Sequence, residues 1–410
     1  MFDALYGDVT FSETTADLVL RPLVQRLRQV RLSNIDSLQM PGIANISRFE
    51  HALGTAYLAS QVGLAVEFSS KDRTALEAAA LIHDTAITPF GHLAEEASQY
   101  LGHQTDHETR WSALLAQEDA RETGGIDRQI LLGRTSGLRE WADKTFRGSG
   151  PEMLARIVDA VQGKGVFGPC IRGAVDLDNL DNVVRIALHM GLQPDSRLPV
   201  KIAKSMCQIN SSAEIVFRHE ALPWIGDWID LRERVYERLM PSPLDFCGKL
   251  MLVYAAVSAF RSGSLNESDW HLTDSELTDR LLGSDSEDVA ETMKRWLLGD
   301  LWDVSEPLWM RGPLPPFTAM EGFAARASEL FARRCFAYRI KDKRKRKVTA
   351  VVESGDRIVV GDSSDRWLLA VGSPKHKPFT REEARRLASL AADCFGAERV
   401  HATSAEALLF

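Results

Sequence analysis

The sequence predicts a mainly α-helical protein with a small α+β lobe at its C-terminal end. Before residue 312, apolar side chains recur mostly at intervals of three and four residues, as on helices with one buried face. Gly312-Pro313-Leu314-Pro315-Pro316 interrupts this pattern, and short strand-like runs follow. We therefore predict a helical domain over residues 1–311, and a lobe over residues 312–410 as a candidate for regulation or oligomerisation.

The composition indicates a soluble globular enzyme. Of the 410 residues, 45% are hydrophobic and 26% are charged. No apolar run reaches the roughly 18 to 20 residues of a membrane span, and Met1-Phe2-Asp3-Ala4 lacks the features of a signal peptide. We therefore expect a cytoplasmic protein with no membrane partner.

Cysteine content, net charge and missing motifs argue against several other classes of protein. The five cysteines contain no CxxC pair, which argues against a disulfide framework and against a thiolate zinc site. A formal charge of −8 makes nucleic acid a possible but disfavoured partner. The sequence contains no GxxxxGK[ST] loop, no GxGxxG after a strand and no GxSxG elbow.

The first predicted helix covers the apolar positions between residues 18 and 30. Four arginines, Arg21, Arg26, Arg28 and Arg31, lie among or just after these positions. The plainer interpretation is a solvated helix face. The alternative is that one or two of the arginines face an anion.

A second helix is predicted to begin after Ser47. Ser47 and Glu50 have the spacing of a capping box, and the apolar pattern continues through Ala59. Arg48 and His51 then lie three residues apart on one helix face. A lone histidine here is most often a packed, hydrogen-bonded side chain, but beside a helix start and an arginine it is a candidate for a phosphate site.

The run Ala78-Ala79-Ala80-Leu81-Ile82 ends in His83-Asp84. This pattern is typical of a buried helix whose last turn presents two metal ligands. Pro89 ends the helical region, and His92 lies just beyond it.

A third helix is predicted around residues 175–185, where polar residues interrupt an apolar segment. Buried acids are costly unless they are paired or bind a cation. Asp181 and Arg185 have the spacing of a simple i to i+4 ion pair. We assign Asp178 to a metal. The polar positions that share this stripe are Asp178, Asp181, Asn182 and Arg185.

Two regions depart from the helical pattern. Residues 116–150 are polar and contain glycines, so we predict a loop-rich insertion. In the C-terminal lobe, strands are predicted at 348–352, 357–360 and 367–371, and a helix at 380–394.

The basic run Lys341-Asp342-Lys343-Arg344-Lys345-Arg346-Lys347 precedes the first of these strands. Such a run is usually a solvated edge that discourages strand pairing. The alternative is a contact with a nucleotide regulator or nucleic acid.

His51, His83, Asp84 and Asp178 together offer two imidazoles and two carboxylates from three separate helices. Mixed nitrogen and oxygen ligands suit one divalent ion such as Mn, Fe, Co, Ni or Zn, and suit Mg less well.

The order of these residues resembles the HD-domain phosphohydrolases, and within them the deoxynucleoside triphosphate triphosphohydrolases. The resemblance covers residues 5–260 and is carried by Arg48-Phe49-Glu50-His51, His83-Asp84, Pro89-Phe90-Gly91-His92, His107-Glu108 and Asp176-Leu177-Asp178-Asn179-Leu180-Asp181. It implies a helical core that holds one metal through His51, His83, Asp84 and Asp178. It also implies attack by water on the α-phosphorus of a dNTP, which releases a deoxynucleoside and inorganic triphosphate.

The same resemblance implies roles for the surrounding side chains. Arg48, His92 and His107 are expected to meet the phosphates, and Glu108 to orient a neighbouring histidine. Asn182 and Tyr236 are expected in the substrate pocket. Enzymes of this kind are commonly homo-oligomers regulated by nucleotides, so we expect a homo-oligomer with a nucleotide regulator.

One departure from the family pattern affects catalysis. Relatives usually carry a histidine three residues after the His83-Asp84 pair, and Ile87 stands at that position here. An apolar side chain cannot transfer a proton, and loss of a general acid costs about 10²- to 10⁴-fold in rate. Leu32, Asn182 and Ile186 also stand where a relative uses polar groups around the sugar. Two alternatives stay open: hydrolysis of another nucleotide phosphoester, which the altered sugar pocket allows, and a nucleotide sensor with little turnover, which Ile87 allows.

Overall fold

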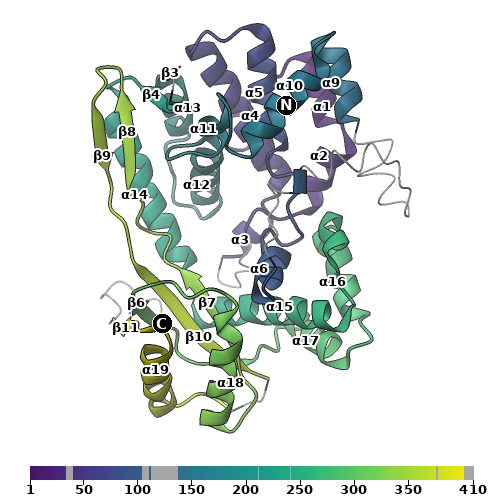
Figure 1. The fold of residues 1–410 in the computed structure, drawn as a ribbon, viewed down its shortest axis with the longest axis vertical. Coiled ribbons are helices and arrows are strands. Elements are labelled where there is room, and N and C mark those ends of the chain that lie inside the picture. The colour runs from purple at the N-terminus through teal and green to yellow at the C-terminus, as the bar shows by residue number, and fades with distance from the viewer. Residues whose placement is uncertain are drawn as a thin grey trace.

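The computed structural model describes residues 1–33, 40–103, 110–111, 137–210, 212–240, 242–374 and 377–400. Helices dominate, and strands are concentrated near the C-terminal end, as the sequence predicts. In Figure 1 a helical body that carries the N-terminus lies above a second body that carries the C-terminal strands, and strands β8 and β9 run up one side.

The upper body is a bundle of helices around one hydrophobic cluster, which extends from Leu5 to Leu239 and also includes Trp270, Val348 and Ala350. Its main helices are α1 (Glu13–Val19), α2 (Pro22–Arg26), α3 (Pro41–Ala44), α4 (Arg48–Ala65), α5 (Ser70–Ile82), α9 (Leu138–Phe146), α10 (Gly150–Val161), α11 (Gly168–Ile171), α12 (Leu177–His189), α13 (Leu198–Ser205) and α14 (Ala221–Leu239).

Helices α4, α5 and α12 position the residues of the predicted metal site. Each begins at a capping side chain: Ser47, Ser69 and Asp176 accept a hydrogen bond from the backbone N–H three residues ahead. Gly54 allows α12 to approach α4 closely. A Cβ atom at this position would lie 2.1 Å from Oδ1 of Asp181, so only glycine fits without a shift.

The lower body has its own hydrophobic cluster, which contains residues between 90 and 100 and between 240 and 397. This cluster includes residues on both sides of the boundary that we predict at 311/312. Its helices are α6 (Leu93–Tyr100), α15 (Pro243–Ser262), α16 (Asp274–Leu282), α17 (Glu287–Leu297), α18 (Ala319–Phe331) and α19 (Arg381–Phe395).

A five-stranded sheet completes the lower body. Strand β10 (Arg366–Ser373) is central, and it pairs with β7 (Phe336–Lys341), β6 (Leu308–Arg311) and β5 (Asp303–Val304), all antiparallel. Strand β11 (Glu398–Arg399) joins the far edge of β6.

A second sheet links the C-terminal lobe to the upper body. Its strand order is β3 (Met206–Ile209), β4 (Ile215–Phe217), β8 (Val348–Val352) and β9 (Arg357–Val360). The β4–β8 pair is parallel and joins segments more than a hundred residues apart. The strands at 348–352 and 357–360 are confirmed, but they pack against the helical body rather than within the lobe.

Helix α15 is long and apolar enough to cross a membrane, with a mean hydropathy of 1.3 over its 18-residue window. However, 78% of that window is buried inside the protein. Its composition is therefore that of a helix surrounded by the lower core.

Two predictions for the upper body need correction. Helix α9 lies inside the region 116–150, where we predicted a loop-rich insertion, and it buries Trp141 and Phe146. The second correction concerns Arg26, one of the arginines that we predicted either on a solvated helix face or facing an anion. It is buried and donates hydrogen bonds to backbone carbonyls, including those of Ile87, Trp270 and Leu272.

Candidate metal centre

Three of the predicted ligands converge on one point between α4, α5 and α12. The candidate ligand atoms of His51, His83 and Asp178 all lie within 4.8 Å of one another. Oδ1 of Asp178 is 3.1 Å from Nε2 of His51 and 3.9 Å from Nε2 of His83. Residues far apart in the sequence thus present two imidazole nitrogens and a carboxylate oxygen to a shared space.

The outer nitrogen of each imidazole is fixed by a hydrogen bond. Nδ1 of His83 lies 2.7 Å from the carbonyl of Ala80, and Nδ1 of His51 lies 2.7 Å from Oδ2 of Asp181. A carbonyl can only accept, so Nδ1 of His83 carries the proton and its Nε2 keeps a lone pair. This is the arrangement in which proteins hold metal-binding histidines.

Both Nε2 atoms are buried and make no hydrogen bond within the described part of the chain. A buried nitrogen without a partner is costly unless something binds it. Two such nitrogens beside a carboxylate form a donor set that suits a divalent first-row ion. The residues therefore fit the cation that the sequence predicts, while its identity is open.

Asp181 anchors His51 from behind. Its carboxylate accepts hydrogen bonds from Arg185 at 2.9 Å and from the hydroxyl of Tyr6 at 2.8 Å. Burial favours the neutral carboxyl, but Arg185 and His51 outweigh it and hold the pKa of Asp181 well below its ordinary value. The predicted Asp181–Arg185 pair is confirmed, and it also positions a candidate ligand.

The carboxylates also act on the imidazole of His51. Burial lowers its pKa, but the nearby carboxylates of Asp178 and Asp181 outweigh burial and raise the pKa to about 9. The surroundings of His51 thus favour positive charge at this position, whether a proton or a metal ion supplies it.

Asp84, the fourth predicted ligand, lies at the edge of this centre. Its Oδ2 is 3.5 Å from Nε2 of His83 and 3.8 Å from Nε2 of His51. The same oxygen accepts a hydrogen bond from Nη1 of Arg48. Asp84 is therefore placed between the candidate ligands and a buried guanidinium, and its role as a ligand stays a prediction.

The centre opens into a cavity of about 340 Å³, which we call the metal-side pocket. Three arginines, Arg48, Arg172 and Arg346, line it together with the acids of the centre, and this mixture suits an anionic ligand bound next to a cation. Its other lining residues are His83, Asp84, His92, Val161, Ile171, Gly173, Asp176, Asp178, Asn179 and Asn182.

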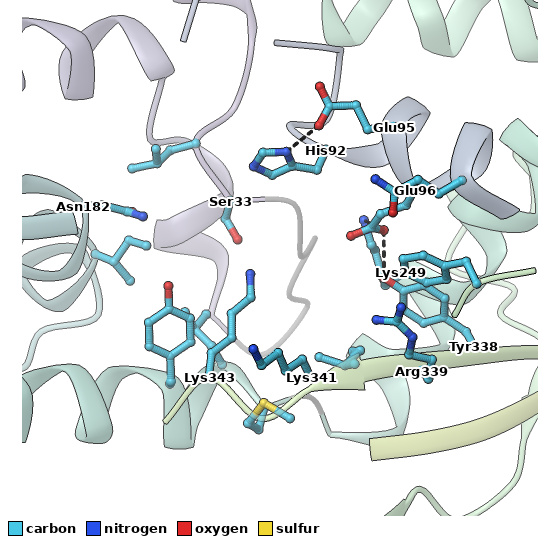
Figure 2. A pocket seen from close by; sticks show the side chains of 18 of the residues that line it. Ser33, His92, Glu95, Glu96, Asn182, Lys249, Tyr338, Arg339, Lys341 and Lys343 are labelled. Carbon is cyan, nitrogen blue, oxygen red and sulfur yellow. Dashed lines mark hydrogen bonds and ion pairs between the residues drawn. The ribbon is translucent and has the colours of Figure 1, made fainter. Parts of the chain in front are cut away.

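A second cavity, of about 310 Å³, shares Arg48, His92 and Asn182 with the first; we call it the adjoining pocket. Figure 2 shows this pocket, with His92 and Asn182 on its walls. Tyr236, which we predict in the substrate pocket, also lines it. Oδ1 of Asn182 is buried without a hydrogen-bond partner in the described chain, so a ligand group can bind it.

His92 stands where the two cavities meet. Its Nδ1 lies 2.8 Å from Oε2 of Glu95, which also pairs with Arg110 at 2.9 Å. These contacts fix the imidazole ring of His92 while 40% of its side chain stays exposed. The predicted positions His107 and Glu108 lie outside the described residues.

Ile87, the position of the expected histidine, is fully buried and lines neither cavity. Its backbone carbonyl accepts a hydrogen bond from Arg26. The side chain at this position therefore contributes packing rather than proton transfer.

The sequence did not predict two sets of polar contacts around the site. Tyr6 and Asp3 contact Arg185 and Asp181 from a segment without any motif. Lys249 and Tyr338 contact Glu96 in the adjoining pocket, and they come from regions in which the sequence analysis found no motif. Lys249, a charged residue directly before the apolar run at 250–260, was the available signal.

Comparison with known proteins agrees with the resemblance to HD-domain proteins that the sequence shows. Residues 48–160 match the HD domain family. The deoxynucleoside triphosphate triphosphohydrolase SAMHD1 of Bos taurus is 23% identical over 58% of this chain and 43% of its own length, and that of Homo sapiens is 22% identical over 58% and 40%. An uncharacterized protein of Methanocaldococcus jannaschii is 22% identical over 65% of this chain and 51% of its own.

The chain thus spans about half the length, or less, of these curated relatives. A solved structure of a phosphohydrolase from Bacteroides thetaiotaomicron covers 92% of this chain and 99% of its own, with a TM-score of 0.65 at 15% identity. This likeness shows that the fold extends over both bodies. Residues 48–160 therefore match an HD domain, and the chain as a whole shares its fold with a solved phosphohydrolase.

Proposed function

We propose that this phosphohydrolase uses one divalent metal ion to hydrolyse dNTPs to deoxynucleosides and inorganic triphosphate. The observation that carries the proposal is the pair of buried Nε2 atoms of His51 and His83, which face Oδ1 of Asp178 beside an arginine-lined cavity. The similarity to deoxynucleoside triphosphate triphosphohydrolases supports the choice of substrate.

His51, His83 and Asp178 would hold the ion, with Asp84 as the predicted fourth ligand. When bound, a divalent cation supplies Lewis acidity and lowers the pKa of water at its open position. Asp181 and the Ala80 carbonyl keep both imidazoles in the tautomer that offers Nε2.

Arg48 and His92 are placed to meet the phosphate next to the centre. Both line the two cavities, and Arg48 already pairs with Asp84. Glu95 contacts Nδ1 of His92 and so orients the imidazole at the junction of the two cavities. Charge that builds on the phosphoryl oxygens would be stabilised by these groups.

A second candidate function follows from Ile87. Because this side chain is buried and apolar, proton transfer to the leaving group has to come from elsewhere, and His92 is the imidazole at the junction of the cavities. If His92 does not supply that proton, the protein hydrolyses a different nucleotide phosphoester or binds nucleotides with little turnover.

A product assay separates these functions. The purified protein is incubated with each dNTP, each NTP and a phosphodiester, with Mn or Mg, and the products are identified by chromatography. Release of inorganic triphosphate supports the proposal. Orthophosphate or monoester products support another phosphoesterase, and tight nucleotide binding without turnover supports a sensor.

A further inference from the structure

The basic segment 341–347 alternates between exposed and buried side chains. Lys341 ends β7, and residues 342–347 connect β7 to β8. Lys341, Lys343 and Lys345 are exposed, whereas Asp342 and Arg344 are buried. The buried side chains can therefore anchor the segment, while the exposed lysines remain accessible to a ligand.

The buried residues fix the segment near its start. The backbone N–H of Asp342 donates to the carbonyl of Arg366 at 3.0 Å. Arg344 binds the carboxylate of Asp342 through Nε and Nη2, both at 2.9 Å, and lies over the ring of Trp309 at 4.4 Å. A bidentate pair of this kind restricts both side chains and backbone.

Arg346 fixes the other end against the upper body. Its Nη2 donates to the carbonyls of Gly173 and Ala174 at 3.0 and 2.9 Å, just before α12. The segment is therefore held at both ends, one on each body. It passes directly beside the two cavities, because Lys341 and Lys343 line the adjoining pocket and Arg346 lines the metal-side pocket.

Lys341 and Lys343 carry charges that the described chain does not balance. Neither makes an ion pair or side-chain hydrogen bond with any residue of the described ranges. The other cations of the pocket have partners within the chain: Lys249 pairs with Glu96 at 2.9 Å, Arg48 pairs with Asp84, and Nε of Arg339 donates to the carbonyl of Pro315 at 2.9 Å. Figure 2 shows both lysines on the floor of the pocket, with His92 across from them.

We propose that Lys341 and Lys343 bind the phosphate groups of the substrate that do not lie at the metal centre. This proposal rests on the proposed function, because it takes the adjoining pocket as part of the substrate site. Ammonium groups are compact charges on flexible stems, which suits a polyphosphate chain with several oxygens. The fixed segment holds both stems at the pocket, which lowers the entropy cost of binding.

The proposal makes the C-terminal lobe part of the substrate site. It predicts selectivity for polyphosphates, because a monophosphate engaged at the metal centre has no further phosphate for the lysines. Exposed cations also attract anions over a distance, so binding should weaken as salt rises.

The test measures binding of inorganic triphosphate and of orthophosphate to the full chain by isothermal titration calorimetry. The variant Lys341→Gln/Lys343→Gln removes both charges at exposed positions. Lys345→Gln is the matched control, because it removes one charge from the same segment where Lys345 pairs with Glu233 at 2.7 Å, outside both pockets.

We expect the double variant to bind triphosphate at least about tenfold more weakly than wild type, since two charge-assisted contacts are lost. Orthophosphate binding should change less than threefold, and Lys345→Gln should match wild type for both ligands. Equal losses for triphosphate in the control and the double variant, or no loss in either, would overturn the proposal.

Binding and turnover separate this proposal from the proposed function. If wild type hydrolyses dNTPs while the double variant keeps its KM, the lysines do not bind substrate and the proposed function stands. If wild type hydrolyses no nucleotide but triphosphate binding depends on both lysines, the anion site stands and the proposed function fails.

Discussion

At the scale of single residues, Asp181 does more than form an ion pair with Arg185. Its carboxylate holds Nδ1 of His51 while Arg185 and Tyr6 hold the carboxylate. Asp181 touches neither the proposed cation nor the substrate, so it is a positioning residue.

We therefore predict that Asp181→Asn weakens metal affinity about 10- to 100-fold without removing any ligand. An amide holds the imidazole less firmly and no longer favours positive charge on His51. The measurement is competition with a metal-binding dye at fixed pH. Unchanged affinity in a folded Asp181→Asn protein would limit Asp181 to packing and stability.

Ile87 leads to a prediction about proton transfer. Because Ile87 is fully buried and lines neither cavity, His92 remains the candidate acid in the described pocket walls. We predict that His92→Gln lowers kcat by about 10²-fold or more while KM changes little. An unchanged kcat would assign the proton to another group.

At the scale of elements, the approach of α12 to α4 through Gly54 keeps the ligand helices in register. A Cβ at Gly54 would meet Oδ1 of Asp181 and Nη2 of Arg185 at 2.1 and 2.4 Å. Neither atom can move freely, because both belong to a buried hydrogen-bond network.

We predict that Gly54→Ala destabilises the protein by about 1–3 kcal/mol and weakens metal binding. Gly226→Ala in α14 is the matched control, because a Cβ there has no heavy atom within 4 Å. It should be neutral or stabilising by up to about 1 kcal/mol. Chemical unfolding of both variants provides the comparison, and equal effects would rule out the close contact as the cause.

A buried ion pair joins α6 to α15. Nζ of Lys249 lies 2.9 Å from Oε2 of Glu96, which also accepts from the hydroxyl of Tyr338 at 2.8 Å. Burial raises the pKa of Glu96, but Lys249 and Tyr338 outweigh burial and lower it below the ordinary value. The ionised carboxylate therefore stabilises the folded state above the unfolded-state pKa, and this contribution is lost as pH falls through the lowered folded-state pKa.

We predict that Lys249→Met costs about 3–5 kcal/mol of stability near pH 7, because it leaves the Glu96 carboxylate buried without its cation. The loss should shrink at acidic pH, as Glu96 becomes protonated. Glu96→Gln in the Lys249→Met background should restore part of the stability at pH 7. Urea unfolding at both pH values tests this, and a pH-independent loss would contradict it.

At the scale of the whole molecule, the two bodies share secondary structure. Strand β8 of the C-terminal lobe pairs with β4 of the helical body, and Val348 and Ala350 belong to the upper core. The lower core contains α15 and α18 on either side of residue 312.

We predict that a chain ending at residue 311 does not fold as a stable domain. It lacks β7, β8 and β10, and so it exposes the apolar face of α15 and one edge of β4. The expected result is aggregation, or dye binding typical of exposed apolar surface, for the truncated chain and neither for the full chain. A cooperative thermal transition in the truncated chain would contradict the shared core.

The sequence was sufficient where the determining interactions are local. Ser47 caps α4 as its spacing predicts, and the strand-like run at 348–352 forms β8. The candidate ligands His51, His83 and Asp178 were also predicted from the sequence, because metal-ligating residue types are chemically distinctive.

Long-range contacts explain the rest. Nothing near Ile215 indicates a parallel pairing with β8, and nothing near Tyr6 indicates a partner at Asp181. The burial of Arg26 depends on carbonyls more than two hundred residues away. Helix α9 was missed because its apolar residues Trp141 and Phe146 are few within a polar region.

The metal content of the purified protein tests the central claim most directly. Inductively coupled plasma mass spectrometry of wild type, His83→Ala and Asp178→Ala, with thermal unfolding as a check on folding, measures ions per chain. We predict about one divalent ion per wild-type chain and a small residual fraction in either folded variant. Full retention of the ion by folded His83→Ala or Asp178→Ala would contradict the assignment of these residues as ligands.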